Sequence, residues 1–315
     1  APSEQLKAFA GVPPLIAQLL INRGVNSPSE LYSFFATSLD SLHDPFLLPG
    51  MDKAIQRLRR SLQTGEIIGV FGDFDADGIA ATALLTLALQ RLGATVIPYI
   101  PHRVREGYGL NSAALKQLMA QGAGLIITAD CGITSVSEIA EAQTSGLDVL
   151  VTDHHMPLGS LPPAAAIVNP NLPGSPYPYS HLAGVGVAFK LIQGLYHSMS
   201  MDCDRSLLEL VALGTVADIA PVTGENRVLV AQGLREMNNH PSPGLKALME
   251  EAGIRQGQVD TEAIAYALAP RINAAGRIDT PIASLQLLTT KSAEQAASLA
   301  RLLQEQNQQR QQMTQ

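Results

Sequence analysis

The sequence has no tryptophan, only two cysteines and few aromatic residues. Cys131 and Cys203 are far apart and form no CxxC pair, which argues against a disulfide framework or a structural zinc site and favours a reducing, cytoplasmic environment. Aromatic residues make up 4% of the chain, too few for a protein built throughout on base-stacking platforms. No apolar run approaches the ~20 residues of a membrane helix, and no basic segment precedes an apolar stretch at the N-terminus. We therefore expect neither a membrane partner nor a secretory signal.

What the sequence does have is a large hydrophobic fraction. Hydrophobic residues make up 46% of the 315 residues and charged residues 16%, which is typical of a globular protein with ample core. A chain of this length suits two lobes, or one large α/β lobe with helical additions. The net charge of −7 argues only weakly against nucleic acid as a partner, because bound divalent cations would offset part of it and the positions of the basic residues matter more.

Short apolar runs alternate with longer helical segments from Glu66 onward. This alternation predicts an α/β fold with a parallel five-stranded sheet flanked by helices. Helical spacing before Glu66 predicts an N-terminal helical lead-in, and further helices and a long C-terminal connecting helix are expected after the sheet. The predicted strands are 67–71, 95–100, 125–129, 149–152 and 166–168, and the helices between the first four are 80–92, 111–121 and 136–145.

We predict four segments from these patterns. Residues 1–65 form the lead-in, 66–240 the α/β domain, 241–291 a helical extension that completes the same core, and 292–315 the start of a helix leading to a second domain. The glycine-rich stretch 183–190 matches neither GxGxxG nor GxxxxGK[ST]. We interpret its glycines as tight helix packing rather than as a phosphate loop.

Polar residues gather at the predicted carboxyl ends of the strands. Asp73, Asp75 and Asp77 follow the first strand, and alternate residues of an extended segment point to one side, so these carboxylates should converge. Three like charges so close are tolerable only when cations compensate them. Ligands of open parallel sheets bind beyond this edge. The polar residues at the later strand ends are His102, Arg103, Arg105, Asp130, Asp153, His154, His155 and Asn169.

This pattern predicts a metal centre. A carboxylate-rich set with one or two imidazoles suits Mg²⁺ or Mn²⁺, and the set is large enough for two cations about 3.5–4 Å apart, which would support hydrolysis of a phosphoester or phosphoanhydride. His154 and His155 are adjacent and point opposite ways in extended chain, so one should bind metal and the other should contact phosphate or support a ligand. Their spacing does not decide which. The candidate ligands are Asp73, Asp75, Asp77, Asp130, Asp153, His154, His155 and Asp218.

A substrate phosphate also needs cationic and polar partners. Arginine is the natural residue for bidentate phosphate contact, although each arginine taken alone is as often a structural ion-pair partner. Asn273, flanked by small residues and two arginines, suits the lining of an active site. The predicted phosphate-binding residues are Arg103, Arg105, His155, Arg271, Asn273 and Arg277.

Four spaced motifs resemble those of the DHH phosphoesterase superfamily, namely residues 72–78 (GDFDADG), 129–132 (ADCG), 153–155 (DHH) and 217–218 (AD). Within this superfamily the chain is similar to the RecJ family of single-strand-specific exonucleases. Further matches to that family are residues 105–110, 169–171, 214–218 and 271–277, together with the lead-in around Asp44-Pro45 and Met51-Asp52. The resemblance extends over nearly the whole chain.

The resemblance implies metal-dependent 5′-to-3′ hydrolysis of single-stranded DNA, with two Mn²⁺ or Mg²⁺ per site, in recombination and repair. Single-strand-binding protein and a helicase are the implied partners. Metal ligation falls on Asp75, Asp77, Asp130, His154 and Asp218, with Asp73 and His155 close by, and catalytic roles fall on Asp130, His154 and His155. Family members continue into a second glycine-rich domain and usually an OB-fold. Neither appears here, so we expect a catalytic core with a complete metal site and a weaker hold on DNA.

Two alternatives stay open. Another hydrolase of the superfamily would act on short oligonucleotides, cyclic dinucleotides or pyrophosphate, but such relatives carry a histidine shortly before the first aspartates, where this chain has Val70 and Gly72. A non-catalytic scaffold of the replication machinery is the other, yet such a protein would have lost ligands, and all four motifs are intact here. A panel of metal-dependent activities would separate these alternatives.

Overall fold

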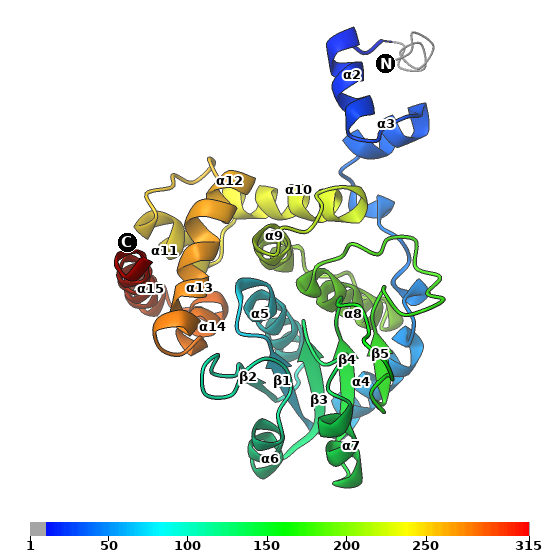
Figure 1. Ribbon diagram of the computed structural model, residues 1–315, viewed down its shortest axis with the longest axis vertical. Helices are drawn as coiled ribbons and strands as arrows, with labels where there is room; N and C mark the ends of the chain where they lie inside the picture. Colours follow the sequence, from blue (N-terminus) through cyan, green and yellow to red (C-terminus); the bar gives the residue numbers. More distant parts are fainter. Residues whose placement is uncertain (1–10, 315) are drawn as a thin grey trace.

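Five parallel strands form the centre of the molecule, in the order β2-β1-β3-β4-β5 (Figure 1). This computed structural model describes residues 11–314; the first ten residues of the predicted lead-in and Gln315 lie outside the described residues. Each predicted strand is present, with ends displaced by two residues at most, so the α/β prediction is confirmed. The strands are β1 (Ile67–Gly72), β2 (Val96–Tyr99), β3 (Ala123–Ala129), β4 (Asp148–Thr152) and β5 (Ala166–Val168).

Helices cover both faces of the sheet, and each face has its own hydrophobic core. On one face, Val70 of β1 packs with α4 (Met51–Thr64), α5 (Ala76–Arg91) and α8 (Gly184–Ser198). On the other, its neighbour Phe71 packs with α6 (Ser112–Ala120) and α7 (Val136–Thr144), because successive strand side chains point to opposite faces. Full burial of such side chains contributes about 1.5–3 kcal/mol each. The strand ends are therefore held from both sides.

Helix α5 begins at Ala76, four residues before the predicted start at residue 80. Asp75 is its N-cap, and the Asp75 side chain accepts hydrogen bonds from the backbone N–H groups of Asp77 and Gly78, both at 3.0 Å. The expectation that three carboxylates alternate along one extended segment was therefore wrong, since Asp77 lies in the first helical turn. A cap of this kind satisfies N–H groups that have no partner within the helix.

The chain after β5 is helical, as predicted. Helix α9 lies alongside α5, and α13 lies alongside α15 (Figure 1). No helix within residues 11–314 combines the length and apolar character needed to cross a membrane. The predicted boundaries after residues 65, 240 and 291 fall between elements, and whether each segment is a folding unit stays a prediction. The helices are α9 (Leu208–Ala217), α10 (Gly224–Asn239), α11 (Pro243–Glu251), α12 (Thr261–Ala263), a π-helix (Ile264–Leu268), α13 (Ala269–Ile278), α14 (Ile282–Thr289) and α15 (Ala293–Thr314).

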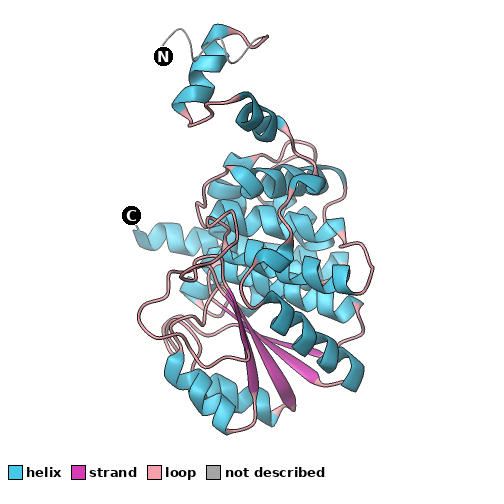
Figure 2. Cartoon of the chain, turned by 90° about the vertical axis from the view of Figure 1, so that its right-hand side faces the viewer, coloured by secondary structure: helices cyan, strands magenta, loops and turns pink. Residues whose placement is uncertain are grey.

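The first helices of the described lead-in are α2 (Pro14–Asn22) and α3 (Pro28–Phe35), which extend away from the body of the molecule (Figure 2). Arg227 of α10 fastens them. Its Nε donates to the Phe34 carbonyl at 2.5 Å, and its guanidinium carbon lies 3.8 Å from the centre of the Phe34 ring. The attachment thus combines a charge-assisted hydrogen bond with a cation–π contact.

A buried ion pair holds the chain around His43, which follows α3, in place. Lys190 of α8 and Glu225 of α10 are 0% and 2% exposed, and Lys190 Nζ lies 2.9 Å from Glu225 Oε1. Lys190 also donates to the His43 carbonyl at 2.6 Å, while the His43 N–H and the Tyr177 hydroxyl donate to Glu225 at 2.8 and 2.5 Å. Burial lowers the pKa of Lys190, opposed by the Glu225 charge. This network joins the lead-in to α8 and α10.

Candidate metal centre

The acidic residues lie at the carboxyl edge of the sheet, between β1 and β3. The chain leaves β1 toward β2 on one side, whereas β3, β4 and β5 follow on the other, and such a reversal opens a ligand crevice in parallel sheets. Asp73 follows β1 and Asp130 follows β3. Their carboxylates are 5% and 3% exposed, and the Asp73 N–H donates to the Ala129 carbonyl at 3.2 Å. Two acids from neighbouring strands are thus buried side by side.

Seven of the predicted ligands come together at this edge, in three groups whose ligand atoms lie within 4.8 Å of one another. Asp130 and His154 each belong to two groups, so the groups adjoin. Each has a size and composition suited to one divalent cation. The groups are Asp130 with His154 and His155, Asp77 with His154 and Asp218, and Asp73 with Asp75 and Asp130.

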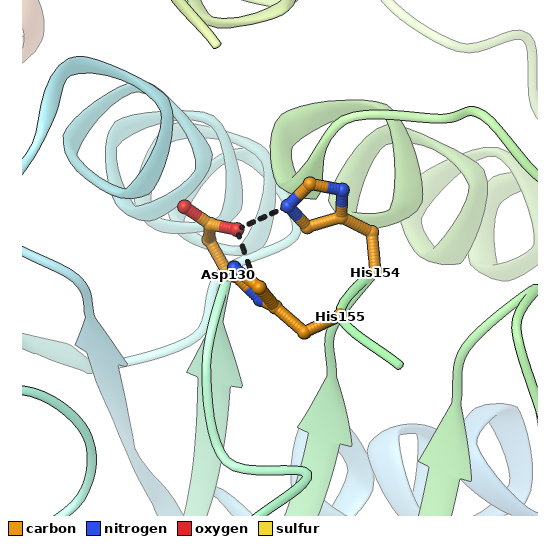
Figure 3. A group of neighbouring side chains, drawn as sticks. All are labelled: Asp130, His154 and His155. Atoms are coloured by element: carbon orange, nitrogen blue, oxygen red, sulfur yellow. Dashed lines mark ion pairs between the residues drawn. The ribbon is translucent and has the colours of Figure 1, made fainter. Parts of the chain in front are cut away.

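Asp130 occupies the middle of this arrangement. Its backbone adopts a left-handed conformation with φ 62°, a local strain that turns the side chain away from the sheet and into the crevice. His154 Nε2 lies 3.1 Å and His155 Nδ1 4.0 Å from Asp130 Oδ1, and Figure 3 shows both rings turned toward this carboxylate. The two histidines therefore do not point in opposite directions, as an extended segment would require.

Asp153 distinguishes the two histidines. Its carboxylate, 1% exposed, lies 2.7 Å from His155 Nδ1 and accepts the backbone N–H groups of His154, His155 and Ile133 at 2.8, 3.0 and 2.9 Å. The hydrogen bond between the Asp153 carboxylate and His155 Nδ1 fixes the His155 ring and raises the pKa of His155. Within the described residues His154 makes no such hydrogen bond. Burial lowers the pKa of His154 and so favours the neutral imidazole, the form that binds metal.

The buried carboxylates of this cluster repel one another, and their pKa values are raised. Burial, followed by the charge of Asp75, raises the pKa of Asp73 to about 7, and the same two causes raise the pKa of Asp218 to about 6. Burial is also the main cause of raised pKa values for Asp77, where Asp218 adds to it, and for Asp130, where Asp77 does. A cluster of acids this close resists ionisation unless positive charge is brought in.

Two buried oxygens of the cluster support this argument. Asp73 Oδ1 and Asp130 Oδ1 are inaccessible to solvent and make no hydrogen bond among the described residues; His154 approaches Asp130 without hydrogen-bond geometry. A divalent cation would satisfy both oxygens and cancel the repulsion between the acids. The residues present thus fit Mn²⁺ or Mg²⁺, and the three adjoining groups offer enough ligands for two ions.

The start of α8 closes the site from the side. The backbone N–H groups of Gly184 and Val185 donate to Asp77 at 2.7 and 3.0 Å, which places a helix N-terminus against a carboxylate. A Cβ on Gly184 would lie 2.4 Å from Asp130 Oδ1, and one on Gly214 of α9 would lie 2.5 Å from Asp77 Oδ1. The interpretation of Gly184 as a packing residue therefore holds, and what it packs against is Asp130 of the candidate metal centre.

The predicted phosphate-binding residues are less uniform. Arg103 lies over the Phe74 ring, with 4.8 Å from its guanidinium carbon to the ring centre, and Arg105 and Arg277 are exposed. Arg271 instead donates to Gln304 Oε1 of α15 and to the Ala267 carbonyl, both at 2.7 Å, which joins two helices. Asn273 Oδ1 accepts the N–H of Ala76 at 2.8 Å and so holds the start of α5 against α13.

Comparison with known proteins identifies the fold and its relatives. Residues 67–215 match the DHH family, N-terminal domain. A solved exonuclease RecJ bound to manganese is 37% identical, with a TM-score of 0.80 and coverage of 87% of this chain and 69% of that one. The chain belongs to the RecJ family.

Other RecJ proteins match over nearly all of the chain. The single-stranded-DNA-specific exonuclease RecJ of Bacillus subtilis (strain 168) is 40% identical over 302 residues, which are 96% of this chain and 38% of that protein. RecJ of Thermus thermophilus, solved with Mn²⁺, has a TM-score of 0.85 at 33% identity and covers 99% of this chain and 45% of that one. Its Mg²⁺ complex gives 0.76 at 30% identity over 99% and 42%. This RecJ-family chain thus spans about half or less of these relatives' length, and the resemblance predicted from the motifs is confirmed.

Several residues support this candidate site of the RecJ-family chain in roles that the sequence did not predict. Asp153 was considered only as a candidate ligand, yet it orients His155. Asn169 and Asn171 donate to the carbonyls of His155 and His154 at 2.9 and 2.6 Å and hold the loop after β4 in place. The sequence signal was present, since residues 169–171 follow the fifth strand, but spacing alone does not reveal which carbonyls they bind.

Proposed function

We propose that this chain is the catalytic core of an exonuclease that hydrolyses the phosphodiester bonds of single-stranded DNA from the 5′ end, with two Mn²⁺ or Mg²⁺ per site. The observation that carries the proposal is the set of three adjoining ligand groups around Asp130 and His154. The names of the RecJ relatives support the substrate, and the solved manganese and magnesium complexes support the metals.

Five side chains would hold the cations, and two more would complete the site. When bound, the cations supply Lewis-acid polarisation of the phosphate and lower the pKa of an attacking water. His154 belongs to two ligand groups and His155 to one, which favours His154 as the ligand and His155 as the phosphate contact. Asp73 joins the site through its unsatisfied oxygen. The five ligands are Asp75, Asp77, Asp130, His154 and Asp218.

The remaining chemistry comes from groups that the fold holds still. His155, fixed by Asp153, would donate a hydrogen bond to a phosphate oxygen and offset charge that develops there. Arg103 stands beside the acids and would pair with a phosphate of the strand. The start of α8 keeps Asp77 in position through two backbone hydrogen bonds. The fold thus holds these groups in fixed positions, and such positioning contributes to catalysis.

We further propose how the chain is organised and where it works. Residues 66–240 would form the catalytic domain with 241–291 completing it, 1–65 would brace it, and 292–315 would begin the helix to a second domain. In the cell the protein would act in the cytoplasm in recombination and repair, with single-strand-binding protein and a helicase as partners. The buried Lys190–Glu225 network supports the bracing role of the lead-in.

The decisive experiment is an activity panel with Mn²⁺ or Mg²⁺. Substrates are 5′-labelled and 3′-labelled single strands, a duplex, a dinucleotide, a cyclic dinucleotide and pyrophosphate. We expect release of mononucleotides from the 5′ end of single strands. Preferential hydrolysis of a cyclic dinucleotide or pyrophosphate would indicate a different hydrolase of the superfamily, and metal binding without any activity would indicate a scaffold.

The matched variants are Asp130→Ala and Asp202→Asn. Asp130→Ala removes a residue shared by two ligand groups, and we expect a loss of more than about 100-fold in kcat, in line with the several kcal/mol that a catalytic metal supplies. Asp202 is an exposed acid outside the ligand groups, so its variant should retain wild-type rates. Equal rates for the two variants would exclude the proposed centre.

A further inference from the structure

The turn after β3 holds Asp130 in an unusual backbone conformation. Asp130 belongs to two of the three ligand groups, and its φ of 62° lies in the left-handed region. A residue other than glycine in this region stores local strain, which persists only where the surrounding structure imposes it. A neighbouring group must therefore hold this turn in its conformation.

That group is the side chain of Thr128, the next-to-last residue of β3. Thr128 Oγ1 donates a hydrogen bond to the Cys131 carbonyl at 2.7 Å, so Asp130 lies within a turn that this bond closes. Within residues 11–314 no second donor binds that carbonyl. A Cβ on Gly132 would lie 2.8 Å from Thr128 Oγ1 and 3.1 Å from its Cγ2, so the chain beyond Asp130 also folds back against this side chain.

The sheet fixes Thr128 itself. The buried Thr152 hydroxyl, at the end of β4, donates to the Thr128 carbonyl at 2.5 Å, and the Thr152 carbonyl accepts the Asp130 N–H at 3.1 Å. Thr128 is completely buried, and its side chain is stiff about χ1 because it branches at Cβ. The hydroxyl that closes the turn is thus held through both its backbone and its rotamer.

The Asp130 carboxylate depends on its backbone more than other acids of the centre do. Asp77 and Asp153 each accept at least two backbone N–H groups, which hold their carboxylates directly. Asp130 Oδ1, in contrast, makes no hydrogen bond within residues 11–314. The conformation of the turn therefore decides where this carboxylate lies.

We propose that Thr128 is a positioning residue of the metal centre, whose hydroxyl holds Asp130 in the left-handed conformation that brings its carboxylate into both ligand groups. This inference rests on the proposed function, in which Asp130 binds metal. Without the hydroxyl, the Cys131 carbonyl would be buried without a partner, and a shift of the turn would relieve both that cost and the strain at Asp130. Thr128 lies just before the motif at residues 129–132, so the motif does not indicate it.

The affinity of the metal-free protein for Mn²⁺ tests this inference without DNA, by electron paramagnetic resonance of free Mn²⁺. Thr128→Val replaces the hydroxyl with a methyl in a side chain of the same shape. We expect its Kd to rise about tenfold or more, the usual cost of losing a group that orients a metal ligand, and Thr128→Ser, which keeps the hydroxyl, to stay within about threefold of the wild type.

The matched control is Thr86→Val, on α5. Thr86 is also buried, but its Oγ1 makes no hydrogen bond within the described residues, so the same substitution removes no hydrogen bond and should leave the Kd at the wild-type value. A wild-type Kd in Thr128→Val would overturn the inference. So would an equal loss of affinity in Thr128→Ser or in Thr86→Val.

Catalysis provides a second measurement. In Thr128→Val the Mn²⁺ concentration that gives half-maximal kcat should rise by the same factor as the Kd, whereas the KM for an oligothymidylate at saturating Mn²⁺ should equal that of the wild type. If the wild type binds Mn²⁺ but hydrolyses no substrate, the proposed function fails, and the Kd values still decide the role of Thr128. Melting temperatures in EDTA show whether each variant is folded. If Thr128→Val is not, Thr128→Cys replaces it, because a thiol is only a weak hydrogen-bond donor and the Kd should again rise.

Discussion

At the scale of single residues, Asp153 shows how a buried carboxylate organises the candidate metal centre without belonging to any of its three ligand groups. It fixes His155 through the ring Nδ1 and holds three backbone N–H groups of the loops around it. Residues that orient the groups around a metal are often as sensitive to change as the ligands. The two histidines of one motif therefore differ because only one of them has this partner.

We predict that Asp153→Asn lowers kcat by about 10–100-fold, the usual cost of removing a partner that orients a metal-site group. The amide oxygen can still accept the N–H groups of His154 and His155, but the amide no longer stabilises a protonated His155. The fall in kcat that the raised His155 pKa causes in the pH profile of the wild type should therefore disappear. Steady-state rates across pH, with Asp202→Asn as the control, provide the measurement. A wild-type profile in Asp153→Asn would contradict the orienting role.

Glu209 is a second residue whose environment has a measurable effect, here on stability. It is 4% exposed on α9 and accepts the Ser242 N–H at 3.0 Å, and burial raises its pKa from 4.5 to about 7. As pH rises from the unfolded pKa to the folded pKa, the unfolded state releases the proton first. Stability from this group is therefore full below about pH 4.5 and falls by about 3 kcal/mol by about pH 7.

We predict that Glu209→Gln removes this part of the pH dependence. Glutamine keeps an acceptor for the Ser242 N–H but does not titrate, so the variant should be more stable than the wild type at about pH 8 and similar to it at about pH 5. Denaturant unfolding at both pH values, with EDTA present throughout, gives the comparison. Parallel pH dependences of the two proteins would show that Glu209 is ionised at no unusual cost.

At the scale of elements, the strands could be predicted to within two residues, because a short apolar run between segments of helical spacing is typical of a buried parallel strand. The gathering of acids at one edge also followed, since the carboxyl ends of parallel strands share an edge. The start of α5 and the partners of Asp77 did not. The amide that binds Asp77 belongs to Gly184, 107 residues later, and contacts so distant leave no local pattern. The partner of Arg271 did not follow either, because the Gln304 side chain that accepts its hydrogen bond lies 33 residues later.

The Lys190–Glu225 pair joins α8 and α10 to the lead-in. We predict that losing one charge of the pair destabilises the protein strongly, whereas losing both costs less than the sum of the two single losses. Glu225→Gln would leave Lys190 charged and buried, with an expected loss of about 3–5 kcal/mol in the free energy of unfolding. Lys190→Met combined with Glu225→Gln should lose less than the sum of the single changes, because no buried charge remains. Urea unfolding of the double-mutant cycle measures this.

The control for that cycle is Lys246→Met, which changes an exposed lysine on α11 and should alter stability by less than about 0.5 kcal/mol. Strict additivity of the two changes in the cycle would mean that Lys190 and Glu225 do not depend on each other in the folded protein.

At the scale of the whole molecule, the metal-free protein holds several mutually repelling acids in one crevice. We predict that Mn²⁺ raises the melting temperature, since an ion bound only by the folded state at 100 times its Kd stabilises it by about 2.7 kcal/mol. For a chain of this size we expect a rise of about 5 °C, reversed by EDTA. Differential scanning fluorimetry with Asp130→Asn as the control tests this. The same rise in that variant would place the ion elsewhere.

The crowding around Gly184 and Gly214 reverses the usual ranking of substitutions. Replacing glycine with alanine is normally among the gentlest changes in helices, and alanine even favours the helical state. Here the added methyl would meet an oxygen of a proposed ligand at 2.4 or 2.5 Å, so the carboxylates of Asp130 or Asp77 would have to move. This centre consequently tolerates substitution least at two glycines, which have no functional group of their own. Surveys of natural variation or engineered libraries that rank positions by side-chain chemistry would overlook these two glycines, although they limit the space around the carboxylates of the proposed active site.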